Sequence, residues 1–164
     1  MIKNGERRMT NSDVTKYKSL SLLRKTFPYI PNEAIEIEMW NTEYEAMNLY
    51  MNGKYYKSRL AKKTPKKAGY FVAIWHKNPE NKNVPFKYEE SPDILVINVI
   101  DNNHKGQFKF HKDMLRNKGI VQSQNYKGKM ALRVYPDWEQ QLNKTALATQ
   151  KWQSKYFEDL SDDD

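Results

Sequence analysis

Cationic and aromatic side chains alternate along residues 57–77, the part of the sequence with the most distinctive chemistry. A basic strand is expected to run into a turn at Thr64-Pro65 and to return as an apolar strand that ends on Lys77. Such a hairpin presents ammonium groups and backbone N–H donors along one rim, which suits the phosphate oxygens of a nucleic acid. The residues predicted to contact nucleic acid are Lys57, Arg59, Lys62, Lys63, Thr64, Lys66, Lys67, Lys77, Lys109 and Arg133.

The same hairpin also has a purely structural interpretation. Lysines on an edge strand prevent that strand from pairing with another molecule, and Phe71 and Trp75 are expected in the core because alternating aromatic residues are usually buried. Exposed aromatic residues of the hairpin could instead stack on bases. Both interpretations of the lysines stay open at this point.

A second group of residues could form a magnesium-dependent nuclease site. In a restriction-endonuclease-like core, a helix glutamate, a strand aspartate and a Glu-x-Lys or Gln-x-Lys pair converge around the metal. Glu43, Asp93, Gln107 and Lys109 are the candidates, and magnesium is the one cofactor expected, under this alternative alone. Oxygen ligands would hold the ion, and the ammonium group would stabilise the developing phosphorane charge.

The competing arrangement of these four residues needs only pairwise contacts. Glu43 would pair with Arg59 or Lys62, Asp93 would cap a turn at a strand start, and Gln107 would occupy an ordinary position in the strand ladder. Because a metal site needs four residues to meet and an ion pair needs two, we favour this second arrangement.

The elements that must position these residues are predicted from periodicity and from capping signals. One helix is expected from Ser12 to the prolines at 28 and 31, a second over 33–51, and a third after Asp137, where Gln140 completes a capping box. Short β-branched or aromatic runs predict five strands, at residues 55–60, 70–76, 94–100, 107–110 and 130–135.

These elements predict an α+β fold. The expected architecture is a single domain over residues 12–160, with a mixed, mostly antiparallel sheet of about five strands flanked by helices. A restriction-endonuclease-like core is one form that this architecture can take. Residues 1–11 are expected to form a flexible basic arm, and residues 161–164 an acidic tail.

The charge of the chain is segregated along its 164 residues. Its formal net charge is +8, yet residues 52–87 carry ten basic groups and one acidic group, and residues 102–136 carry eight and one. If these two segments are neighbours in space, they form one positive face, which is typical of proteins that bind polyanions.

Composition also excludes several classes of protein. The absence of cysteine excludes disulfides, thiol catalysis and zinc fingers, and three histidines leave little for a nitrogen-rich metal site. The sequence has no apolar run long enough to span a bilayer and no signal-peptide pattern at its start. We therefore expect a cytoplasmic protein without a membrane partner.

Several local motifs together resemble a known family. They are NTEYEA at 41–46, RLAKKTPKKAG at 59–69, FV at 71–72 with Trp75 and Lys77, PF at 85–86, GQFKF at 106–110, GI at 119–120, RVYP at 133–136, and TQKWQ at 149–153 with Tyr156 and Phe157. The sequence resembles the MepB-like family of small bacterial proteins, named after a member encoded in a multidrug efflux operon. The family pattern often has Gln at Tyr70 and Pro at His111, so no role is carried over to these two positions.

The resemblance implies nucleic-acid binding and no established reaction. With the charge pattern, it predicts a protein that uses a basic hairpin face to contact the phosphates of DNA or RNA, single strands included, with little sequence preference. The alternatives are the magnesium-dependent nuclease and an adaptor that uses the same lysines to bind an acidic protein.

Overall fold

The computed structural model describes residues 5–162. Its main element is a seven-stranded sheet in which all neighbours are antiparallel except the parallel pair β4 and β9. In spatial order the strands are β1 (Glu6–Arg8), β2 (Ile35–Glu38), β3 (Met47–Met51), β4 (Lys54–Leu60), β9 (Ile94–Asp101), β10 (His104–His111) and β12 (Phe157–Asp159).

A smaller sheet and a short ribbon accompany the main sheet. The smaller sheet contains β11 (Ala131–Val134), β6 (Tyr70–Ala73) and β5 (Lys62–Lys63), and the ribbon contains β7 (His76–Lys77) and β8 (Asn83–Val84). The α-helices are α1 (Asn11–Lys16), α2 (Ser19–Thr26), α3 (Lys112–Asn117) and α4 (Lys144–Gln153). Single 3-10 turns are η1 (Asn32–Ala34), η2 (Thr42–Tyr44), η3 (Tyr88–Glu90) and η4 (Ser154–Tyr156).

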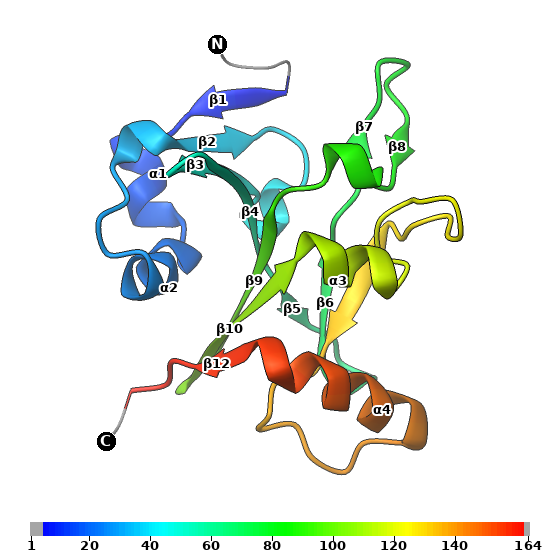
Figure 1. The fold of residues 1–164 in the computed structure, drawn as a ribbon. Coiled ribbons are helices and arrows are strands. Elements are labelled where there is room, and N and C mark those ends of the chain that lie inside the picture. Colours follow the sequence, from blue (N-terminus) through cyan, green and yellow to red (C-terminus); the bar gives the residue numbers. More distant parts are fainter. Residues whose placement is uncertain (1–4, 163–164) are drawn as a thin grey trace.

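Two hydrophobic cores lie on opposite faces of the main sheet. The period of two along β9 turns Ile94 and Val96 toward a core shared with α2, and Leu95 and Ile97 toward a core shared with the smaller sheet and α3. Figure 1 shows α1 and α2 beside β1–β3, and α3 and α4 on the other side of β9 and β10. The α+β class and the single domain with a mixed, mostly antiparallel sheet are therefore confirmed.

The five predicted strands are present as β4, β6, β9, β10 and β11. The strand expected over 70–76 ends earlier, at Ala73, because the backbone N–H groups of Ile74 and Trp75 both donate to the carbonyl of Met130. The chain then starts the separate ribbon at His76. The described part of the chain contains no helix long and apolar enough to cross a membrane.

The helix predicted over 33–51 is wrong. This segment forms β2 and β3, which pair with each other and bury Ile35, Ile37, Met47 and Leu49 on the face that α2 covers. The helix prediction rests on Ile35, Met39, Ala46, Met47 and Tyr50, which fit helical spacing, whereas the residues that are buried alternate with the strand period of two. The backbone at Asn41 is left-handed, with φ of 63°, which is incompatible with a continuous helix.

The flexible arm predicted over 1–11 is also wrong for the described residues 5–11. Glu6–Arg8 form β1, antiparallel to β2, and the Arg7 guanidinium donates to both carboxylate oxygens of Asp13 at 2.6 and 2.8 Å. The helix begins after Thr10 instead of Ser12, because Thr10 and Asp13 form a capping box. An ion pair between strand and helix thus orders this segment.

The last helix also begins later than predicted. Asn143, whose side chain accepts from the N–H of Ala146, is the N-cap of α4, so the capping box predicted at Asp137 and Gln140 is wrong. After α4 the chain adds β12 to the edge of β10. In the predicted acidic tail, Asp162 pairs with Lys25 and Lys105 at 2.9 and 3.4 Å, and residues 163–164 lie outside the described residues.

Gly106 allows β12 to pack closely on β10. A Cβ atom at this position would lie 2.4 Å from two ring carbons of Phe157, and 3.2 Å from the Trp138 ring. We expect Gly106→Ala to lower the free energy of unfolding by about 1–3 kcal/mol, because the ring must shift to admit the methyl group. Urea denaturation measures this, and adding Phe157→Leu should restore part of the loss. An unaltered midpoint in Gly106→Ala would contradict the packing.

Candidate nucleic-acid interface

The outer face of the smaller sheet carries cations around one aromatic ring. Strand register places Phe71 opposite Lys62 on β5 and opposite Arg133 on β11, so these three side chains share one face. The alternate residues, Tyr70 and Val134 among them, belong to the core. The period of two therefore separates an apolar inner face from a cationic outer face.

Arg133 connects the basic turn to the sheet. Its guanidinium donates to the Thr64 hydroxyl at 2.9 Å and to the carbonyl of Ala68 at 3.0 Å. Gly69 ends the turn with φ of 80°, and a Cβ atom there would lie 2.7 Å from the Tyr135 ring. The turn that carries Lys66 and Lys67 is therefore fixed at both ends.

The cations of this sheet and turn are called here the basic face: Lys62 and the half-buried Arg133 on the outer face, Lys66 and Lys67 on the turn, and the exposed Lys63, whose strand position faces the other way. The Lys62 and Lys63 side chains are 44% and 69% exposed and lie 3.2 and 3.4 Å from the carboxylates of Glu43 and Asp101. An exposed pair such as Lys62–Glu43 contributes about 0–1 kcal/mol, so phosphate can replace this carboxylate at small cost, whereas Asp101 is 20% exposed and also accepts from the Tyr70 hydroxyl. Lys66 and Lys67 have no ion-pair partner within residues 5–162.

A small groove extends the basic face along the edge of β11. This cavity of about 220 Å³ is bordered by Lys118, Lys129 and Arg133 together with the aromatic rings of Tyr135 and Trp152. The Lys118 ammonium lies 5.1 Å from the centroid of the Trp152 ring. The sequence pattern shows that residues 102–136 are basic, but it does not predict this groove, because the groove forms only where residues after α3, β11 and α4 meet.

Lys57 and Arg59 do not belong to the basic face, and their burial contradicts the prediction that they meet phosphate at the surface. They are 4% and 0% exposed, and both pair with the buried carboxylate of Glu38. The Lys57 ammonium also donates to the Asn48 side chain at 2.8 Å. Burial alone would raise the pKa of Glu38, but Arg59 and Lys57 hold it below its ordinary value.

The other two predicted cations lie elsewhere. The Lys77 ammonium is 5.6 Å from the Trp75 ring centroid, on the ribbon that follows β6. Lys109 projects from β10 toward α2, with its ammonium 4.6 Å from the Phe27 ring. Lys109 is therefore on the opposite side of the main sheet from the smaller sheet and the basic face.

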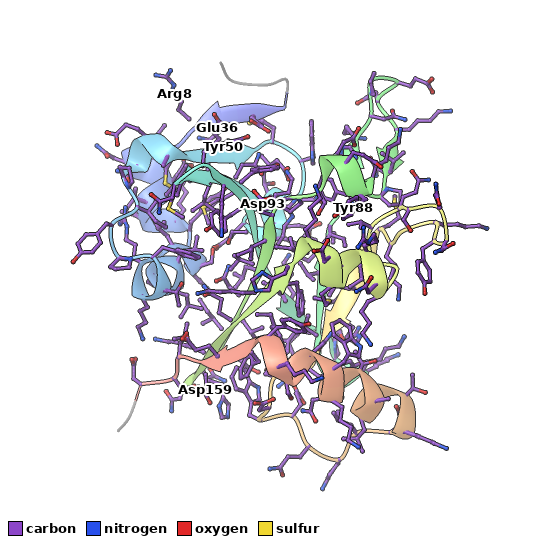
Figure 2. The ribbon with its side chains drawn as sticks, viewed as in Figure 1. Arg8, Glu36, Tyr50, Tyr88, Asp93 and Asp159 are labelled. Carbon is purple, nitrogen blue, oxygen red and sulfur yellow. The ribbon has the colours of Figure 1, made fainter. Side chains whose placement is uncertain are left out.

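The four nuclease candidates have separate partners. Glu43 pairs with Lys62, and the Asp93 carboxylate, just before β9 in Figure 2, accepts from the N–H of Tyr55 at 2.9 Å. Gln107 is fully buried, donates to Asn98 at 2.8 Å and accepts from Thr26 at 2.9 Å.

These contacts correspond to the pairwise arrangement that we favoured. Gln107 and Lys109 do share one face of β10, as the period of two predicted, and that face is covered by α2. Between residues 5 and 162, no group of three or more His, Asp or Glu side chains has the arrangement of a metal site. The structure does not bring the four candidates to one point.

Glu6 is a further member of the buried polar group around Asn48. Its carboxylate accepts from the Asn48 amide at 2.8 Å. Burial, and after it the neighbouring Glu36 carboxyl, together raise the pKa of Glu6 from 4.5 to about 7. The folded protein thus holds a proton on this carboxyl that the unfolded chain releases.

This pKa difference predicts a pH dependence of stability. Between pH 4.5 and about 7 the Glu6 carboxyl is ionised in the unfolded chain but still holds its proton in the folded protein. The stability that this proton contributes is therefore complete below pH 4.5 and is lost as the pH rises to about 7. We expect the stability of Glu6→Gln relative to the wild type to increase from pH 5 to pH 8, as measured by urea denaturation. A constant difference over that range would contradict the raised pKa.

Comparison with known proteins gives consistent results for most of the chain. A sequence model of the MepB-like family matches residues 38–159. A solved structure described as the crystal structure of MepB is 46% identical, with a TM-score of 0.78, and the match covers 90% of this chain and 99% of that one. A search of curated proteins gave no match.

Proposed function

The chain belongs to the MepB-like family, and from the arrangement of its basic face we propose that it binds nucleic acid by contacting phosphates with little sequence preference. The proposed site of action is the cytoplasm, where both DNA and RNA are present. The proposal includes no chemical step on the bound strand.

The exposed turn at Lys66 and Lys67 carries this proposal. Both ammonium groups extend from a turn that Arg133 fixes, and neither has an ion-pair partner within the described residues. Lys62 and Lys63 lie next to this turn on β5, where Lys62 pairs with the exposed Glu43 and Lys63 with the half-buried Asp101. A turn whose backbone is fixed holds its lysines at set positions, so they can meet successive phosphates without the backbone having to become ordered first.

The chemistry of these groups supports weak sequence preference. Lysine ammonium groups are point charges that recognise phosphate oxygens, which are the same at every nucleotide. The groove beside β11 adds Lys118 and Lys129 at one end of the same surface. A flexible single strand can reach both the turn and the groove more easily than a stiff duplex can.

Binding of labelled 20-nucleotide strands and duplexes, of both DNA and RNA, tests the proposal. We expect binding that weakens strongly between 50 and 200 mM salt and that differs little between unrelated sequences of one strand type. An unlabelled oligonucleotide should compete far better than polyglutamate of equal charge. Equal competition by polyglutamate would favour an acidic protein partner, and absence of salt-dependent binding would exclude the proposal.

A further inference from the structure

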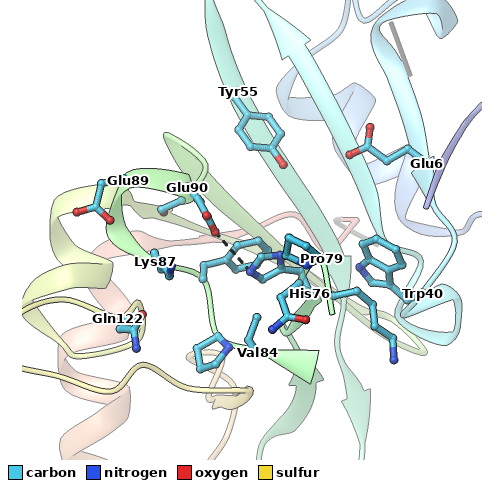
Figure 3. Close-up of a pocket in the computed structure, with 15 residues that line it drawn as sticks. Glu6, Trp40, Tyr55, His76, Pro79, Val84, Lys87, Glu89, Glu90 and Gln122 are labelled. Atoms are coloured by element: carbon cyan, nitrogen blue, oxygen red, sulfur yellow. Dashed lines mark ion pairs between the residues drawn. The ribbon is translucent and has the colours of Figure 1, made fainter. Parts of the chain in front are cut away.

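A second, larger cavity lies between the main sheet and the β7–β8 ribbon. Its volume is about 830 Å³, which is within the usual range for small-molecule sites. Figure 3 shows its walls: Glu6 comes from β1, Tyr55 from β4, Trp40 from the segment after β2, and His76 from β7. The cavity is thus built from elements that are distant in sequence.

The walls of this cavity are aromatic and flat. The rings of His76 and Phe86 stack with centroids 4.5 Å apart and an angle of 4° between their planes. The indole of Trp40 and the phenol of Tyr55 border the same space. Because His76 and Phe86 cover each other and Lys57 lies 5.0 Å from the Phe86 ring centroid, a planar ligand can stack only on the outer face of His76 or beside Trp40 and Tyr55.

Three polar atoms in these walls have no hydrogen-bond partner although they are shielded from solvent. They are Nε1 of Trp40, Oε2 of Glu6 and Nε2 of His76, whose closest charged group is the Glu90 carboxylate at 3.6 Å. An indole N–H can only donate, whereas the Glu6 carboxyl accepts when it is ionised and can also donate when it holds its proton. Because buried polar groups in native proteins are nearly always paired, the cavity favours a ligand that offers both an acceptor and a donor.

The charges around the cavity balance one another. Behind its wall, Glu38 is paired with both Lys57 and Arg59. At its border, Lys77 and Lys87 accompany Glu89 and Glu90. A strongly charged ligand would therefore find no excess of the opposite sign, and an uncharged polar ring fits better.

The cavity and the basic face are joined by the turn around η2. The Asn41 side chain, next to Trp40, donates to the carbonyl of Trp75 at 2.8 Å, and Glu43 in the same turn pairs with Lys62 of the basic face. A strand that contacts Lys62 through a phosphate thus passes close to the turn that carries Trp40.

From these observations we infer that the cavity takes up a single nucleobase, which stacks against its aromatic walls and pairs with Trp40 Nε1 and Glu6 Oε2. The base can belong to a bound strand or to a free nucleotide. The first of these sources rests on the proposed function. Either source supplies the same ring with the same donors and acceptors.

Two single-stranded oligomers of equal length separate base recognition from phosphate contact. One carries normal bases, and the other carries an abasic tetrahydrofuran sugar at every position, so their phosphates are identical. At one salt concentration we expect the wild type to bind the base-containing oligomer about fivefold more tightly or better, since stacking of one base contributes that much or more. The slope of log K against log salt should be similar for both oligomers.

Conservative variants assign this difference to the cavity. Trp40→Phe keeps a ring but removes the N–H donor, and Glu6→Gln keeps the size of the side chain but changes its acceptor. Both should reduce the advantage of the base-containing oligomer without changing the salt slope. Trp40 also packs on Gly5, so the Trp40→Phe variant can unfold for a structural reason. In that case the test rests on the Glu6→Gln result alone.

A second experiment tests whether the base can come from a free nucleotide. The protein is titrated with adenosine, guanosine, cytidine and uridine monophosphates, and ribose 5-phosphate is the control. A mononucleotide that binds the wild type more tightly than either variant supports the cavity, with or without a strand. Equal binding of the two oligomers together with no mononucleotide binding would overturn the inference. If both oligomers bind equally and their binding still depends on salt, the proposed function stands. If neither oligomer binds, the proposed function fails. Binding of mononucleotides then decides alone whether the cavity takes up a base.

Discussion

Replacing Glu38 with alanine is expected to lower the free energy of unfolding by about 3–5 kcal/mol. The substitution removes the carboxylate that neutralises two buried cations, Lys57 at 4% exposure and Arg59 at 0%. Without Glu38, both cations stay buried with no carboxylate partner. Urea denaturation at neutral pH measures the loss.

Glu43→Ala is the matched control for this experiment. Glu43 also pairs with a lysine, but its side chain is 67% exposed, so its removal should cost no more than about 1 kcal/mol. Similar losses in the two variants would show that the buried ion pairs of Glu38 contribute no more to the free energy of unfolding than an exposed pair does.

Reversing three charges of the basic face is expected to abolish detectable nucleic-acid binding at 0.1 M salt. The variant is Lys62→Glu with Lys66→Glu and Lys67→Glu, which removes three phosphate contacts and places three carboxylates beside the strand. Loss of three contacts alone corresponds to roughly 100-fold at 0.1 M salt, given a slope of about 0.7–0.9 per contact, and repulsion adds to it. Fluorescence anisotropy with a labelled single strand measures the effect.

The control variant has the same net charge but carries its substitutions elsewhere. Lys16, Lys18 and Lys54 are exposed on α1, at the junction of α1 and α2, and at the start of β4, outside the basic face. Lys16→Glu with Lys18→Glu and Lys54→Glu should retain most of the binding. Equal losses in both variants would mean that overall charge, and not the basic face, controls binding.

The strands that sequence reasoning identified are those with local signals. The stretch 94–100 is apolar on both faces, and Gly, Pro and Asn residues bound the other predicted strands. In β2 and β3, by contrast, two patterns overlap: Ile35, Met39, Ala46 and Met47 suit a helix, while the pairs Ile35–Ile37 and Met47–Leu49 alternate as in strands. Only the left-handed turn at Asn41 and the pairing with distant strands distinguish the two, and neither is a local property.

The candidate site was predictable to a similar degree. The exposed cations at Lys62–Lys67 follow from the basic turn, since a tight turn must be at the surface. The burial of Lys57 and Arg59 was not predictable, because it depends on Glu38, which the sequence placed on a helix that does not exist. The groove at Lys118 and Lys129 requires α3, α4 and β11 to meet, which the sequence pattern does not specify.

The most direct test of phosphate binding by the basic face is the slope of log K against log salt for a single strand. It is measured for the wild type, for Lys62→Ala with Lys66→Ala and Lys67→Ala, and for Lys16→Ala with Lys18→Ala and Lys54→Ala. If each of the three basic-face lysines neutralises one phosphate, the first variant should have a slope smaller in magnitude by about two to three, and the second should have the wild-type slope. Wild-type slopes in both folded variants would contradict phosphate binding by this face.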